Sequence, residues 1–156
     1  MTTAEPLKTP CITIFTNADI IQQASRLTSS GKIAVTNTNL VYLKIDDNYI
    51  HELYPLLTKT SIQKPNYFSP GAEGAHISVI YPEENRMITT QELNQQHHFT
   101  IKNIATAEIN HKIYYVLLAE APSLIELRRR YQLPDLLSFR GYAIGFHITF
   151  GFENIT

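Results

Sequence analysis

The chain has few of the features that mark several large classes of protein. It has one cysteine, Cys11, among 156 residues, so an internal disulfide framework is excluded. No apolar run approaches the roughly 20 residues of a membrane helix. The first ten residues lack the basic start and apolar stretch of a secretory signal. We therefore expect a cytoplasmic protein that does not bind membranes, with secretion through a receptor-read signal left open.

The chain also lacks an excess of charge of either sign. It has 13 basic and 14 acidic residues, and its formal net charge is -1. Proteins that bind long duplex nucleic acid neutralise many phosphates with basic side chains, so this balance argues against that class. A small anionic ligand remains compatible with it.

The length and apolar content fit one domain. With 156 residues and 44% hydrophobic composition, the chain has enough apolar side chains for a continuous core. We expect a monomer with a single domain over residues 1–156. Within it we interpret residues 1–38 as an N-terminal addition, with a strand "CITIF", a helix capped by Thr16 or Asn17, and a strand "KIAVT".

Residues 39–156 contain two similar halves. The first has a strand "VYLKID", a helix that Pro55 shortens, a loop over 64–74, and a strand "HISVI". The second has a strand "YYVLLAEA", a helix, a loop, and a strand "HITFGF". His76 and His147 are 71 positions apart, and Tyr42 and Tyr115 are 73 apart. This nearly constant offset predicts a duplicated strand, helix, strand unit that forms two lobes related by a pseudo-two-fold axis.

Further patterns place the remaining elements. Two capping boxes, Thr89 with Glu92 and Ser123 with Glu126, predict helix starts. A hairpin is predicted to turn near Asn110, and the last strand is predicted over residues 142–152.

The two histidine strands carry the same four-residue motif. It reads His76-Ile77-Ser78-Val79 in the first half and His147-Ile148-Thr149-Phe150 in the second. Side chains two apart on a strand share a face, so each strand presents one imidazole and one hydroxyl together. The alternating residues Phe146, Ile148, Phe150 and Phe152 are predicted to face the core.

Two imidazoles and two hydroxyls suit a phosphodiester. Its cleavage needs a base for the attacking oxygen, an acid for the leaving oxygen, and donors for the other phosphate oxygens. Histidine titrates near pH 6.5 when unperturbed, so a neutral and a protonated imidazole coexist near neutrality. This scheme needs no metal and no cofactor.

The paired motifs resemble the two-histidine (2H) phosphoesterase superfamily, whose signature is His, apolar, Ser or Thr, apolar, present twice. The likeness extends from about Leu40 to Phe152. It implies an α+β fold with two pseudo-symmetric lobes of antiparallel sheet and flanking helices around a central cleft. It also implies that His76 and His147 are the catalytic acid and base, in an order left open, and that Ser78 and Thr149 bind the phosphate.

The resemblance further implies a class of substrate. Members of the superfamily act on nucleotide- or RNA-derived cyclic phosphodiesters of the 2′,3′ type or on 2′,5′ linkages. We therefore expect a phosphodiesterase with a nucleotide or short RNA as its substrate. The alternatives are a non-catalytic module of the same fold that binds a nucleotide or RNA end, and a protein-interaction module.

Five more side chains are weaker candidates for substrate contacts. Some relatives place a cationic side chain near the phosphate directly after the second motif. This chain has "FGF" there, so the cation must come from elsewhere, and Arg140 is the candidate. Tyr42, Tyr81 and Tyr142 are candidates to stack on a base, and Lys44 shares the strand face of Tyr42. For each tyrosine the ordinary alternative is partial burial in the core, and for Lys44 it is an edge position with its ammonium in water.

Overall fold

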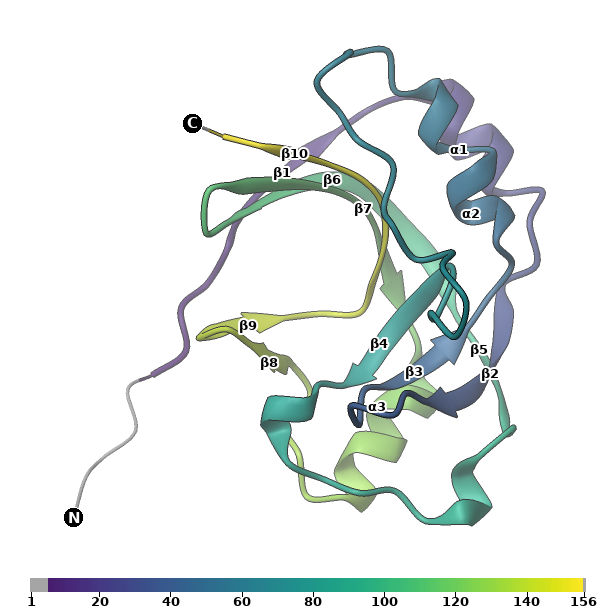
Figure 1. The fold of residues 1–156 in the computed structure, drawn as a ribbon, viewed down its shortest axis with the longest axis vertical. Coiled ribbons are helices and arrows are strands. Elements are labelled where there is room, and N and C mark those ends of the chain that lie inside the picture. The colour runs from purple at the N-terminus through teal and green to yellow at the C-terminus, as the bar shows by residue number, and fades with distance from the viewer. Residues whose placement is uncertain (1–5, 156) are drawn as a thin grey trace.

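The computed structural model describes residues 6–155, which form an eight-stranded antiparallel sheet, a short hairpin and three helices (Figure 1). The strands are β1 Cys11–Phe15, β2 Ser30–Val35, β3 Val41–Lys44, β4 His76–Ile80, β5 Gln96–His98, β6 Thr100–Ile109, β7 Lys112–Glu120, β8 Leu137–Phe139, β9 Tyr142–Ile144 and β10 His147–Asn154. The helices are α1 Ala18–Ala24, α2 Asn48–His51 and α3 Pro122–Arg130, and 3₁₀ turns cover Tyr54–Leu56, Pro82–Glu84 and Thr90–Glu92.

The order of strands in the large sheet displays the predicted repeat. It is β1-β6-β7-β10-β4-β3-β2-β5, so β4 and β10 lie side by side at the centre and the halves extend outward from them. The repeated unit begins one strand earlier than predicted, because β2 lies before residue 39. Each half consists of two hairpin strands, a helix and a return strand: β2, β3, α2 and β4, then β6, β7, α3 and β10. The expected two-lobed α+β fold is confirmed, with both lobes sharing one sheet.

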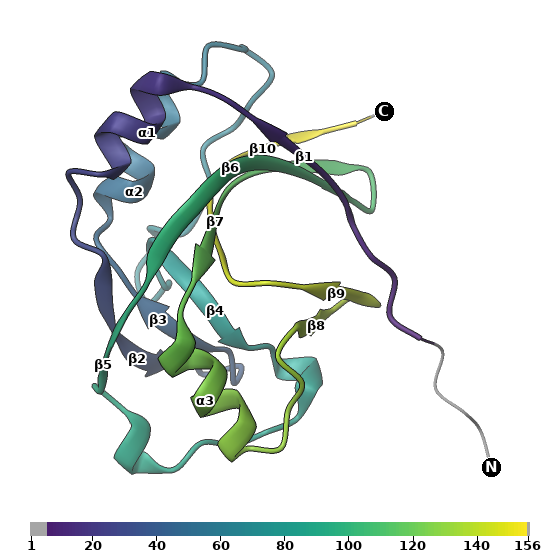
Figure 2. The same cartoon turned by 180° about the vertical axis from the view of Figure 1, so that it is seen from behind.

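The residues before position 38 contribute to the same sheet. β1 pairs with β6 along one edge, and β2 pairs with both β3 and β5 near the other. Figures 1 and 2 show that β1, β6, β7 and β10 form a curved layer and that the β8–β9 hairpin lies on its concave side.

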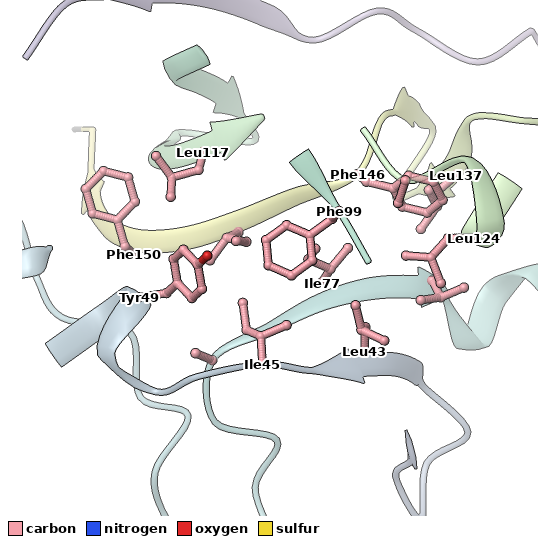
Figure 3. Packing of buried hydrophobic residues seen from close by; sticks show 14 of the residues in the cluster. Leu43, Ile45, Tyr49, Ile77, Phe99, Leu117, Leu124, Leu137, Phe146 and Phe150 are labelled. Carbon is pink, nitrogen blue, oxygen red and sulfur yellow. The ribbon is translucent and has the colours of Figure 1, made fainter. Parts of the chain in front are cut away.

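The helices pack on the opposite side of the sheet, where the main core lies (Figure 3). α2 contacts β10 and α3 contacts β4, so each helix covers the return strand of the other half. The core includes Ile77, Ile148 and Phe150, none of which is exposed to solvent. The predicted alternation of the two motif strands is therefore confirmed at these positions.

Local signals in the sequence predicted the helix starts unequally. Asn17, one of the two predicted candidates, caps α1, because its side chain accepts a hydrogen bond from the Ile20 amide. Neither predicted capping box forms its side-chain hydrogen bonds, although a 3₁₀ turn does begin directly after Thr89, and α3 begins at Pro122, one residue before Ser123. Ser123 instead hydrogen-bonds His97, and Glu92 pairs with Arg130.

The helices are short. α2 has four residues and passes into a 3₁₀ turn that contains Pro55, in agreement with the predicted shortening. Among residues 6–155, no helix combines the length and the apolar character needed to cross a bilayer.

The last strand differs from the prediction in two ways. It is divided into β9 and β10, and β9 pairs with β8 rather than joining the large sheet. A β-bulge between Thr149 and Gly151 then reverses the alternation. Phe152 therefore leaves the core face, lies opposite Tyr114 and packs under the Lys112 ammonium.

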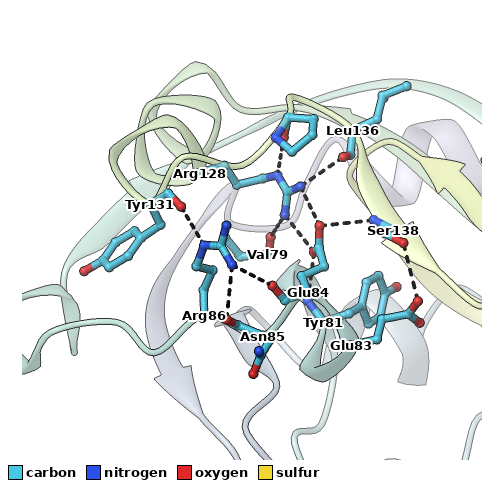
Figure 4. Close-up of polar contacts among 11 residues, drawn as sticks. Val79, Tyr81, Glu83, Glu84, Asn85, Arg86, Arg128, Tyr131, Leu136 and Ser138 are labelled. Carbon is cyan, nitrogen blue, oxygen red and sulfur yellow. Dashed lines mark hydrogen bonds and ion pairs between the residues drawn. The ribbon is translucent and has the colours of Figure 1, made fainter. Parts of the chain in front are cut away.

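A buried ion pair joins the two halves (Figure 4). The Arg128 guanidinium on α3 is fully buried and forms two hydrogen bonds of 2.7 and 2.8 Å with the Glu84 carboxylate. Arg128 also donates to the carbonyls of Val79, Pro134 and Leu136. Glu84 in turn accepts from the amides of Tyr81 and Ser138. The end of β4, helix α3 and the start of β8 are thus held together by one charged network.

We expect Glu84→Gln to destabilise the fold by about 3–5 kcal/mol, because it leaves the buried Arg128 charge without its counter-ion. Urea unfolding with constant slope would measure this as a lower midpoint. The matched control is Asp135→Asn, which removes one carboxylate from the exposed pair with Arg129. An equal loss in both variants would contradict the importance of burial.

Candidate active site

The four polar side chains of the twin motifs gather on the concave face of the sheet. β4 and β10 are antiparallel, with Ile148 opposite Ile77, so His147 lies across from Ser78 and Thr149 across from His76. All four side chains line one cavity of about 380 Å³. The predicted convergence of the two motifs is therefore present, on neighbouring strands of one sheet.

Each imidazole is oriented by a glycine two positions earlier. The His76 Nδ1 lies 2.7 Å from the Gly74 carbonyl oxygen, and the His147 Nδ1 lies 2.9 Å from the Gly145 carbonyl oxygen. A carbonyl oxygen only accepts, so Nδ1 carries the proton in both rings. The Nε2 atom of each neutral ring is then left to exchange a proton with a ligand.

Burial lowers the pKa of both histidines below the ordinary value. For His147 the hydrogen bond to Gly145 opposes this shift. For His76 burial again lowers the pKa most, the hydrogen bond to Gly74 and the charge of Glu73 oppose the shift, and His147 and Lys44 add to it. Burial therefore favours the neutral form of both rings.

The chain reaches β4 through a tight polar turn. The Asp47 carboxylate accepts from the Ala75 amide and from the Lys44 ammonium, which also donates to the Ile45 carbonyl. Gly74 has a φ of +64°, and a Cβ there would lie 2.6 Å from the Asp47 carboxylate. This turn sets the start of β4, and with it the position of His76.

The weaker candidates divide between the cavity and its surroundings. Tyr81 and Arg140 line the cavity, and Tyr81 packs against Phe139 with ring centroids 4.8 Å apart. The Tyr42 ring contacts the His76 ring edge-on, with ring centroids 5.7 Å apart, but Tyr42 does not line the cavity. Lys44 is also outside the lining, with its ammonium paired to Asp47.

Tyr142 is not part of the cavity. Its backbone forms a bridge with Lys8, and its side chain does not line the cavity.

Three polar cavity residues were not among the predicted site residues. Tyr67 and Glu73 come from the loop over 64–74, and Tyr114 comes from β7. The centroids of the Tyr67 and His76 rings lie 4.9 Å apart, and burial raises the pKa of Tyr67 to about 12. Tyr114 shares a strand face with Val116, which also lines the cavity, but the sequence did not show that this face meets the site. Nothing in a loop sequence shows which of its side chains turn inward.

The polar groups of the cavity suit acid–base chemistry on a small anion. The cavity offers two imidazoles, two hydroxyls of Ser78 and Thr149, tyrosines, one guanidinium and one carboxylate. Within the part of the chain that the structure describes, no three His, Cys, Asp or Glu side chains gather as ligands for one metal ion.

Comparison with known proteins gives one match. The family model described as "Swiss Army Knife, 2H phosphoesterase domain" matches residues 41–155, from the first residue of β3 to the residue after β10. No curated protein and no solved structure matches. The match covers most of the chain and both histidine motifs, so the chain belongs to the 2H phosphoesterase family.

Proposed function

We propose that the protein hydrolyses a nucleotide- or RNA-derived phosphodiester, cyclic of the 2′,3′ type or 2′,5′-linked, by acid–base catalysis with His76 and His147 and without a metal. The observation that carries the proposal is the shared placement of two imidazoles, each with Nδ1 held by a glycine carbonyl, in one cavity. Membership of a family of phosphoesterases supports it.

The geometry fits the roles that the reaction needs. One imidazole removes a proton from water through Nε2, and the other donates a proton to the oxygen that leaves phosphorus. Ser78 lies across from His147, and Thr149 lies across from His76. Each hydroxyl can therefore donate a hydrogen bond to a non-bridging oxygen of a phosphate held between the imidazoles. These donors add no charge, so they suit the single negative charge of a phosphodiester.

The cavity limits the size of the bound part of the substrate. Its volume of about 380 Å³ is at the lower end of the range for small-molecule pockets. Tyr81, Tyr114 and Phe139 give it aromatic surface beside the polar groups. We therefore propose that it holds one nucleotide unit, stacked on aromatic rings, with any further chain outside.

We expect His76→Ala and His147→Ala each to lower kcat by about 10²–10⁴, since each removes one proton-transfer group. The readout is initial rate on a panel of 2′,3′-cyclic nucleotides, 2′,5′-oligoadenylate, ADP-ribose cyclic phosphate and RNA ends, with chelator present. His98→Ala is the matched control, because His98 is exposed and lies on β5. Full activity of both motif variants on every cleaved substrate would refute the proposal, and binding without turnover by the unaltered protein would favour the non-catalytic alternative.

The pH profile gives a second test. Because burial lowers the pKa of both histidines below about 6.5, the free protein holds one neutral and one protonated ring mainly below that pH. We therefore expect kcat/KM, which reports the free protein, to be greatest below about pH 6.5 and to decline toward pH 8. A bound phosphodiester favours the protonated rings, so the basic limb of kcat should lie at higher pH. Steady-state rates over this range measure both limbs, and a kcat/KM maximum above about pH 7.5 would contradict the roles assigned.

A further inference from the structure

The start of the chain supplies part of the cavity wall, although it lies outside the match to the family. The family model begins at residue 41, whereas Pro10 and Ile12 line the cavity from the N-terminal side. Ile12 belongs to β1, which pairs with β6 and forms one edge of the large sheet. This side of the cavity is therefore built by a segment that the family match does not cover.

Residues 8–12, which we call the N-terminal wall, are held by backbone hydrogen bonds on both sides. The Lys8 amide donates to the Gly141 carbonyl, and the Lys8 carbonyl accepts from the Ala143 amide, both at 2.8 Å. These bonds attach the segment to the β8–β9 hairpin, and at Ile12 it is already paired with β6. Figures 1 and 2 show this segment running from the tip of the hairpin to the edge of the curved layer. The N-terminal wall is thus fixed in place beside the cavity.

Ile12 extends a surface that continues across the sheet. It lies opposite Ala107 on β6, which lies opposite Tyr114 on β7, and all three side chains line the cavity. The N-terminal wall and β6 together contribute four residues to the lining, and all four are apolar: Pro10, Ile12, Ala107 and Ile109. The cavity therefore has an apolar end next to the Tyr114 ring.

This apolar end lies away from the two imidazoles. In the strand order β1-β6-β7-β10-β4, His147 is on β10 and His76 is on β4. Three strand spacings separate β1 from β10, which is roughly 14 Å along the sheet. A phosphate held between the imidazoles is therefore distant from Ile12. The N-terminal wall meets the part of the substrate that lies farthest from phosphorus, and in a nucleoside 2′,3′-cyclic phosphate that part is the base.

The chemistry of the apolar end suits a base better than a second polar group. Ile12 lines the cavity and is 44% exposed, so its apolar surface is open to water. The face of a base would cover this surface and remove apolar area of both partners from water. A further phosphate or sugar hydroxyl would lose hydration there without gaining a hydrogen bond from these four side chains. The loop before β4 instead offers a phenol and a carboxylate, from Tyr67 and Glu73.

We propose that the N-terminal wall contacts the base of the substrate, and that Ile12 selects phosphodiesters that carry a base over those that have the sugar alone. This inference rests on the proposed function and deepens it by assigning a specificity residue outside the family match. The base takes no part in the change of bonds at phosphorus, so its contact with Ile12 is equal in the bound substrate and in the transition state. Such a contact lowers KM and leaves kcat unchanged.

Ile12→Ala tests the contact with two substrates that differ only in the base. For adenosine 2′,3′-cyclic phosphate we expect KM to rise about tenfold while kcat changes less than about twofold. Methyl riboside 2′,3′-cyclic phosphate has the same sugar and phosphate without a base, so its KM should not change. Ile14→Ala is the matched control, because Ile14 lies on the same strand and is 59% exposed but does not line the cavity. An equal rise in KM for both substrates, no rise for the adenosine compound, or the same effect from Ile14→Ala would overturn the proposal.

Ala107→Leu tests the same end of the cavity by filling it. Ala107 is half-buried and lies opposite Ile12, so a larger side chain there takes space from the base. We expect kcat/KM for the adenosine compound to fall about tenfold or more, with the value for the methyl riboside compound unchanged. The second compound also reports whether the variant is folded. An unchanged value for the adenosine compound, or an equal loss on both, would contradict the proposal.

Binding measurements separate failure of this inference from failure of the proposed function. If the unaltered protein cleaves both compounds and Ile12→Ala affects them equally, the wall is wrong and hydrolysis stands. If the unaltered protein cleaves no phosphodiester, hydrolysis is wrong, and calorimetric Kd values for the same two compounds test the wall. A Kd that Ile12→Ala raises about tenfold for the adenosine compound alone would support the wall, and equal Kd values in the two proteins would overturn it.

Discussion

The contact between β4 and β10 is the constraint on which the rest of the structure depends. The central pair Ile77 and Ile148 lies on the core face, and both side chains are fully buried. Because the strands are antiparallel, burying these two residues places all four polar motif side chains on the opposite face. A shift of one residue in either strand would send one imidazole and one hydroxyl into the core. The apolar residues of each motif therefore fix the register of the strands, and this register places the polar residues of both motifs in the cavity.

The sequence was sufficient to predict the two-lobed fold, because local and repeated sequence patterns indicate it. The two motifs and the cap at Asn17 each rest on short-range rules that hold across proteins, and the nearly constant offset between the halves shows the repeat. The helix that Pro55 shortens is of the same kind. These rules were enough for the family, the two lobes and the four central side chains.

What the sequence did not show depends on tertiary contacts. Phe152 leaves the core because one bulge at Thr149–Gly151 reverses the strand alternation, and a bulge has no strong local signal. Ser123 and Glu92 form long-range contacts instead of caps, since partners far along the chain compete for the same side chains. Tyr67 and Glu73 reach the cavity from a loop whose path is set by packing. The twin "Gly-x-His" spacing was visible in the sequence, but the structure was needed to show that the glycine carbonyl orients the ring.

The crossed packing of the helices has a consequence for how such a molecule is assembled. α2 of the first half covers β10 of the second, and α3 of the second half covers β4 of the first. The guanidinium of Arg128 reinforces this exchange by binding the Val79 carbonyl on β4. In one half alone, the edge of the return strand would be exposed, and the helix would lack the strand on which it packs. Each half thus supplies the surface that the helix of the other half covers, and the cavity with two histidines exists only where the two halves meet.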